Sequence, residues 1–162
     1  MPYRLLEVDD TQSAEDAESP NMLIQGDNLE ALKALLPYYA GRVRCILIDP
    51  PYNTQSAFDH YDDNLKHSQW LAMIPPRLQL LRELLTEDNS IWVTVDDHEG
   101  HHLKVLMDEV FGRSGFIADI AWKKGTERPM IERSDRLLTI FWFLRNQRQQ
   151  NPIKRSRKSA SI

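Results

Sequence analysis

The chain has 162 residues, of which 41% are hydrophobic and 27% are charged, and its formal net charge is −4 at pH 7. These values fit one globular domain with a core of its own, and they exclude a membrane-spanning helix because no apolar run is long enough. The acidic first 20 residues lack the apolar segment of a signal peptide, and the single cysteine, Cys45, excludes an internal disulfide framework. We therefore expect a cytoplasmic protein.

The charge is unevenly distributed along the chain. Residues 1–122 carry nine Lys and Arg against 21 Asp and Glu, whereas residues 123–162 carry eleven against three. A basic end on an acidic body suits contact with phosphates, but it is also typical of a solvated tail.

The first half of the chain predicts a leader followed by alternating strands and helices. Residues 1–21 read as a disordered acidic leader, and residues 22–24 as a short strand. Asn28 is placed to cap a helix over the next eleven residues, whose leucines follow helical spacing. Residues 43–48 are a short apolar run rich in β-branched residues, which predicts a strand buried on both faces.

The second half continues this alternation. Residues 68–85 predict a helix that Pro75 and Pro76 should kink or split. A turn, a strand at 91–95 and a helix at 99–111 follow, and Gly112 is placed to end that helix. Two further strands are expected at 116–122 and 137–144. Residues 146–162 read as a basic, disordered tail.

This order predicts an α/β domain with a largely parallel sheet. In open sheets of this kind, ligands bind beyond the carboxyl ends of the strands. Three acidic segments fall at predicted strand ends, namely Gly26-Asp27, Asp49 to Tyr52 and Asp96-Asp97. We expect the functional site to be built from them.

The segment Asp49-Pro50-Pro51-Tyr52 has a distinctive chemistry. Proline fixes the backbone and offers no N–H, but its carbonyl still accepts hydrogen bonds. A carboxylate and a rigid neighbouring carbonyl could together accept both hydrogens of an amino group, and Tyr52 could stack on a flat ring. This combination suits the exocyclic amine of a nucleobase flipped out of a duplex. The alternative is an aspartate-led turn that only ends a strand.

The segment DPPYNT after an apolar strand resembles the catalytic motif of amino-group DNA methyltransferases that use S-adenosylmethionine. QGDNLEAL before it, and LLRELLTEDNSIWVTVDDHEGHHLKVLMDEVFG and FIADIAWKK after it, resemble the Mod subunit of type III restriction–modification systems over roughly residues 22–145.

The resemblance implies a Rossmann-like methyltransferase fold and methylation of adenine N6 in double-stranded DNA. It implies that Asp49 and the Pro50 carbonyl, within the motif that also contains Pro51, bind the target amine, and that Tyr52 stacks on the base. It further implies that Asp27 binds the adenosine part of S-adenosylmethionine. A restriction subunit and a second copy of the chain are the partners expected from the family.

The chain departs from the family in its glycines. The family uses the pattern F-x-G-x-G, which lets the backbone approach the methionine part of the cofactor. None of the six glycines lies in such a pattern. We therefore expect residues 22–145 to form a partial catalytic domain, with an incomplete cofactor site and weak or no activity alone.

Two other functions remain open. His98-Glu99-x-x-His102 matches a zinc-binding pattern in which one helix presents two histidines and a glutamate base, so a zinc hydrolase is an alternative. A non-catalytic DNA-binding module is the other, since phosphate contacts require only the basic end. We expect Cys45 to be a small core residue, and the four tryptophans to be core as well: Trp70, Trp92, Trp122 and Trp142.

Overall fold

The computed structural model describes residues 5–11, 13, 20–53, 66–123 and 137–144. The expected basic tail, residues 146–162, lies wholly outside these residues. About half of the expected leader, residues 1–21, also lies outside them. The described elements are α1 (Asn28–Tyr39), β1 (Val43–Ile48), α2 (His67–Leu84), β2 (Leu85–Val95), α3 (Gly100–Phe111), a short 3-10 turn (Arg113–Gly115), β3 (Phe116–Lys123) and β4 (Leu137–Leu144).

The four strands form one sheet in the order β1-β2-β4-β3. β1 and β2 are parallel, with α2 as the crossover between them, which is the connection that parallel neighbours require. β4 runs antiparallel to both β2 and β3. The α/β class is confirmed, but the prediction of a largely parallel sheet is wrong for the described strands, because β3 and β4 pair with each other as antiparallel neighbours.

The sequence predicts a turn after α2, but in the structure these residues form the irregular first part of β2. Leu85 pairs with Val43 and Ser90 with Cys45, so four residues of β2 face one residue of β1. Asp88 within this stretch has a φ of 62°, in the left-handed region. An insertion of this kind in a strand is a bulge, and regular pairing begins only at Ser90.

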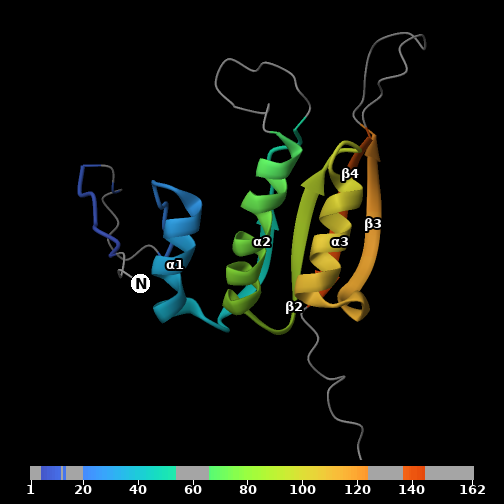
Figure 1. Cartoon of the computed structure of the whole chain (residues 1–162). Coiled ribbons are helices and arrows are strands. Elements are labelled where there is room, and N and C mark those ends of the chain that lie inside the picture. Colours follow the sequence, from blue (N-terminus) through green and yellow to red (C-terminus); the bar gives the residue numbers. More distant parts are fainter. Residues whose placement is uncertain (1–4, 12, 14–19, 54–65, 124–136, 145–162) are drawn as a thin grey trace, which may run out of the picture.

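α2 and α3 cover one face of the sheet (Figure 1). α3 turns Leu103 and Met107 toward the sheet, and both are fully buried. Side chains of both helices interdigitate with every second residue of the strands, as the two-residue repeat of a strand requires. The resulting core contains Ile46, Trp70, Ile74, Leu78, Leu81, Leu85, Ile91, Val93, Val95, Leu103, Met107, Phe111, Phe141 and Phe143.

The opposite face of the sheet carries no helix among the described elements. Leu47 and Trp122 on this face are 71% and 59% exposed. Trp92 and Trp142 stack on each other there, with ring centroids 4.8 Å apart, and both are half-buried. The expectation that β1 is buried on both faces is therefore wrong, and Trp70 alone of the four tryptophans lies in the core.

Cys45 also lies on the open face, at the exposed edge of the sheet. Its prediction as a core residue is wrong because β1 is an edge strand and Cys45 alternates with the buried Ile46.

The N-terminal segment differs from its prediction. Residues 22–24 form no strand, and Leu23 is 97% exposed. The helix after it is capped by Asp27 rather than by Asn28, since the Asp27 carboxylate accepts the N–H groups of Leu29 and Glu30. α1 then packs against α2 at the edge of the molecule (Figure 1).

Pro75 and Pro76 do not split α2, which is one helix of 18 residues. Prolines at these positions leave two carbonyls of the preceding turn without their N–H partners. Arg77 donates from its guanidinium to the neighbouring Met73 carbonyl at 2.8 Å, which supplies a side-chain donor to the same turn. Among the helices that the structure describes, none has the length and apolar character needed to cross a membrane.

Candidate active site

Asp49 follows β1 at the carboxyl end of the strand, as predicted. Its Oδ1 accepts a hydrogen bond from the Tyr52 hydroxyl at 2.5 Å and another from the Thr94 hydroxyl on the neighbouring strand β2. Within the described residues, Asp49 Oδ2 makes no hydrogen bond, and the side chain is exposed. The carboxylate is therefore held in place through one oxygen while the other remains available to a donor.

Tyr52 donates to this carboxylate as a neutral phenol. Burial, together with the hydrogen bond to Asp49, raises the pKa of Tyr52 from 10.0 to about 12. Both causes act against the phenolate, because a low-dielectric site and a nearby negative charge disfavour a second negative charge. Tyr52 thus keeps its proton at any physiological pH.

The two proline carbonyls differ in their contacts. The Pro51 carbonyl accepts a hydrogen bond from the indole N–H of Trp70 at 2.8 Å. Trp70 is fully buried in the core, so this bond ties the turn to the first part of α2. The Pro50 carbonyl accepts no hydrogen bond from the described residues. Pro51 anchors the turn, and Pro50 offers its oxygen beside the Asp49 carboxylate.

Asn53 continues the turn in the left-handed conformation, with a φ of 59°, which asparagine tolerates better than most residues. Its amide donates to Glu99 Oε1 at 2.7 Å, and His67 Nδ1 lies 3.0 Å from the same oxygen. Sequence reasoning missed Asn53, His67 and Thr94 as members of this site. The asparagine inside DPPYNT was the available signal; the other two are recognised only through the fold.

The zinc pattern His98-Glu99-x-x-His102 does not form as predicted. α3 begins at Gly100, so His98 lies outside the helix and cannot share a helical face with His102. His98 instead contacts the buried Asp96, with 2.9 Å between Nδ1 and Oδ2. The requirement that one helix present both histidines is not met, and the prediction of a zinc hydrolase through these residues loses its basis.

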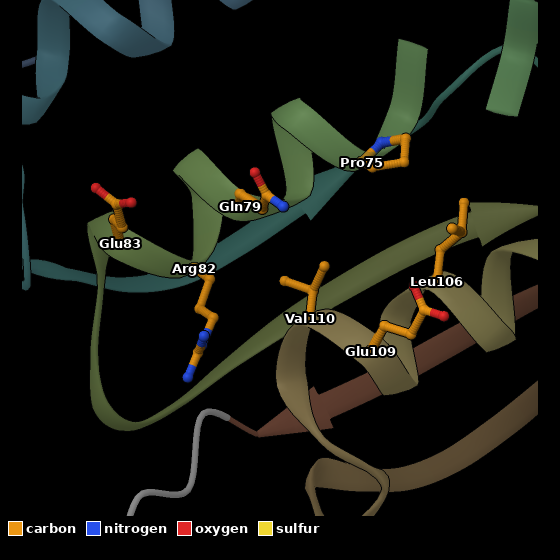
Figure 2. A pocket seen from close by; sticks show the side chains of 7 residues that line it. All are labelled: Pro75, Gln79, Arg82, Glu83, Leu106, Glu109 and Val110. Carbon is orange, nitrogen blue, oxygen red and sulfur yellow. The ribbon is translucent and has the colours of Figure 1, made fainter. Parts of the chain in front are cut away.

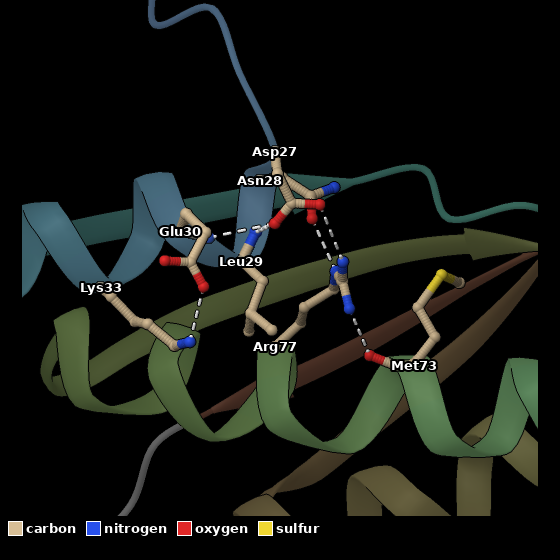
Figure 3. A network of polar contacts seen from close by, with 7 residues as sticks. All are labelled: Asp27, Asn28, Leu29, Glu30, Lys33, Met73 and Arg77. Atoms are coloured by element: carbon tan, nitrogen blue, oxygen red, sulfur yellow. Dashed lines mark hydrogen bonds and ion pairs between the residues drawn. The ribbon is translucent and has the colours of Figure 1, made fainter. Parts of the chain in front are cut away.

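Asp27 lies at the start of α1 in a polar network (Figure 3). Besides capping the helix, its Oδ2 lies 3.7 Å from the Arg77 guanidinium, and that guanidinium donates to Asn28 Oδ1 at 2.6 Å. The Asp27 side chain is 60% exposed. In the described part of the chain no hydrogen bond or ion pair joins Asp27 to residues 49–53, so the structure does not merge the two predicted sites into one.

A shallow pocket of about 540 Å³ lies between α2 and α3 (Figure 2). It is lined by Pro75, Gln79, Arg82, Glu83, Leu106, Glu109 and Val110. These residues belong to the later turns of both helices, whereas residues 49–53 contact their first turns through Trp70 and Glu99. The pocket is therefore separate from the candidate active site.

The geometry supports one kind of chemistry. Among the described residues, the Asp49 carboxylate is bonded through Oδ1 alone, the carbonyl of the next residue, Pro50, accepts no hydrogen bond, and Tyr52 lies three residues after Asp49. No side chain in this group is an activated nucleophile, since Tyr52 is a neutral phenol. The site can accept two N–H hydrogens and offer an aromatic face.

The chain is similar in sequence to a known family of proteins. Residues 43–161 match the model of a family described as DNA methylase. The chain is 36% identical to the type III restriction-modification enzyme EcoP15I Mod subunit of Escherichia coli over 78% of its own length, and 39% identical to the EcoPI Mod subunit of Escherichia phage P1 over 74%. These alignments span 24% and 23% of the two relatives, so the chain corresponds to about a quarter of their length.

Solved structures share the fold. TTHA0409 of Thermus thermophilus, assigned as a DNA modification methylase and complexed with S-adenosyl-L-methionine, superimposes with a TM-score of 0.55 at 16% identity, over 85% of this chain and 60% of that one. The cytosine-N4-specific PvuII DNA methyltransferase gives a TM-score of 0.51 at 19% identity, over 75% and 48%. The α/β fold is that of S-adenosylmethionine-dependent DNA methylases.

Proposed function

Since the chain belongs to the DNA methylase family, we propose that it binds the target amine in an S-adenosylmethionine-dependent DNA methyltransferase acting on adenine N6. The observation that carries the proposal is the Asp49 carboxylate, which Thr94 and Tyr52 hold through Oδ1, while neither Oδ2 nor the adjoining Pro50 carbonyl accepts a hydrogen bond from a described residue. Adenine is proposed over cytosine because the most similar relatives named above are type III Mod subunits.

In the proposed mechanism, Asp49 Oδ2 and the Pro50 carbonyl accept the two hydrogens of the adenine amine. This contact favours a pyramidal nitrogen whose lone pair is free to attack. The N–C bond to the methyl group forms as the S–C bond of the donor breaks, and the surplus amine proton leaves through Asp49 to solvent. Tyr52 does not compete for that proton, because its pKa of about 12 keeps it protonated.

The methyl group is supplied by S-adenosylmethionine when bound, and Asp27 is the residue we assign to its adenosine part. Asp27 fits this role in one respect: its carboxylate is 60% exposed, and among the described residues Oδ2 makes only the 3.7 Å ion pair with Arg77. A carboxylate with such an oxygen can accept a hydroxyl hydrogen.

The proposed partners follow from the relatives. We assign double-stranded DNA as substrate, a restriction subunit as the partner, and a second copy of the chain as a further candidate. A base inside a duplex must be flipped out to reach Asp49, and Tyr52 would then stack on it. Because the proposed substrate is DNA, we also propose that the protein is located in the cytoplasm.

The proposal can be tested by ligand binding without requiring turnover. In nuclear magnetic resonance titrations, adenosine should bind at residues 49–53 more tightly than purine riboside, which lacks the 6-amino group. A charge-assisted hydrogen bond contributes about 1.5–3 kcal/mol, so the preference should be roughly tenfold to a hundredfold. Asp49→Ala should remove most of the preference, because only the Pro50 carbonyl remains as an acceptor, whereas Asp119→Ala, at an exposed acidic position on β3, should preserve it.

Equal binding of the two nucleosides would overturn the proposed role of Asp49. A preference for cytidine over adenosine would instead move the target to cytosine N4. Where methyl transfer to DNA is detectable, mass spectrometry of the digested DNA should find N6-methyladenine, and Asp49→Ala should remove it.

A further inference from the structure

His67, Glu99 and His102 form a cluster that the proposed methylation does not use. One potential ligand atom of each residue lies within 4.8 Å of those of the other two. His67 begins α2, whereas Glu99 and His102 lie at the start of α3. The two imidazole rings are 4.4 Å apart between centroids. His67 and Glu99 are 32 positions apart in the sequence, and the packing of two helices brings them together.

Glu99 is the unusual member of this cluster, because its carboxylate is buried and only half satisfied. The residue is 3% exposed. Oε1 has Asn53 and His67 as partners, but Oε2 is buried without a hydrogen bond from the described residues. A buried carboxylate oxygen without a partner is costly, and such groups in native proteins usually have a hydrogen-bond donor or a cation. Glu99 Oε2 is therefore a position at which a donor or a cation would be stabilised.

The chemistry of the three ligands selects the kind of cation. Two imidazoles and one carboxylate are the ligands that zinc and similar transition metals prefer, whereas calcium and magnesium require mainly oxygen ligands. The His67 side chain is 45% exposed, so an ion could enter from solvent and retain water as a fourth ligand. The negative charge of Glu99 offsets the partial positive charge at the N-terminus of α3, which would otherwise disfavour a cation there.

The spacing is close to that of a bound ion. Ligands about 2.0–2.2 Å from a tetrahedral zinc ion stand roughly 3.4 Å apart. The largest separation here is below 4.8 Å, so the side chains must close by about 1 Å or a little more. Both histidines are exposed, so a rotation of their side chains would close this gap, while Glu99 is buried.

We propose that His67, Glu99 and His102 bind one divalent transition-metal ion, with zinc as the type. The ion joins the starts of α2 and α3 and is the partner that Glu99 Oε2 lacks. Glu99 Oε1 keeps its hydrogen bond from the Asn53 amide, which holds the turn after Tyr52 in place. The predicted zinc pattern named two of the three ligands, and the fold replaces His98 with His67. The role is structural support of the turn and not hydrolysis.

The test uses the full chain, purified without a polyhistidine tag, and titrated with cobalt(II) and with zinc against a chromophoric chelator. We expect one ion per chain. His67→Ala and His102→Ala should each weaken binding by at least about tenfold to a hundredfold, the loss seen even for residues that only support a ligand. His101→Ala removes a neighbouring exposed histidine outside the cluster and should bind as tightly as the unmodified chain.

Circular dichroism of each variant separates loss of a ligand from loss of the fold. Glu99→Gln keeps an acceptor for Asn53 and should stay folded while binding the metal more weakly. Absence of stoichiometric binding, or equal weakening in His101→Ala, would overturn the site. Because no nucleoside or methyl donor is present in this experiment, its result is independent of the proposed methylation.

Discussion

Trp70→Phe tests how the motif turn is fixed to the core. The substitution keeps an aromatic ring at a fully buried position but removes the indole N–H, which lies 2.8 Å from the Pro51 carbonyl. Leaving that carbonyl without its partner costs about 1–3 kcal/mol, and the smaller ring adds about 1 kcal/mol through incomplete packing. We therefore expect the free energy of unfolding to fall by about 2–4 kcal/mol, out of a total that is about 5–15 kcal/mol for typical domains.

Urea denaturation followed by circular dichroism measures this change. With an m-value of about 2 kcal/mol per M, the midpoint should fall by about 1–2 M. Trp122→Phe is the matched control, because Trp122 is 59% exposed and donates no hydrogen bond to a described residue, so its midpoint should hardly move. If Trp70→Phe and Trp122→Phe behaved alike, the bond to Pro51 would not be what holds the turn.

Two further predictions concern the polar groups of the two predicted sites. The folded-state pKa of Tyr52 is raised to about 12 from 10.0, so the stability it contributes is complete below pH 10 and lost between pH 10 and 12. Tyr52→Phe should lose less stability than the unmodified chain in alkaline titration monitored by circular dichroism; an identical decline would show that Tyr52 titrates normally. Asp27→Ala should lower the free energy of unfolding by about 1 kcal/mol through loss of the helix cap, whereas Asp27→Ser should retain most of it. In calorimetry with S-adenosylmethionine, weaker binding by Asp27→Ser at unchanged stability would indicate a direct cofactor contact, and unchanged binding would leave Asp27 as a cap alone.

Much of the local structure could be predicted from the sequence because it depends on near neighbours. Helical spacing of apolar residues located α2 and α3 to within a residue or two, and Gly112 ends α3 with a φ of 81°. The predicted strand at 43–48 is confirmed with its acidic end at Asp49. Each of these features follows from side-chain periodicity or backbone freedom over a few residues.

The errors arose where distant segments had to meet. An apolar run shows that a strand prefers burial but not which neighbouring element covers it. Leu47, Trp122 and Cys45 are therefore expected in a core, but the described elements cover nothing on that face of the sheet. The antiparallel pairing of β3 with β4 is likewise a long-range choice.

The sequence by itself determined which segment we propose to bind the amine, because the chemistry of Asp49, Pro50 and Tyr52 is contained within four consecutive residues. Only the tertiary structure decided what surrounds it. Thr94 reaches Asp49 because β1 and β2 are parallel neighbours, and Glu99 reaches Asn53 and His67 because α3 starts where β2 ends. Such contacts depend on how helices and strands pack across the sheet, and a local sequence pattern carries no record of that packing.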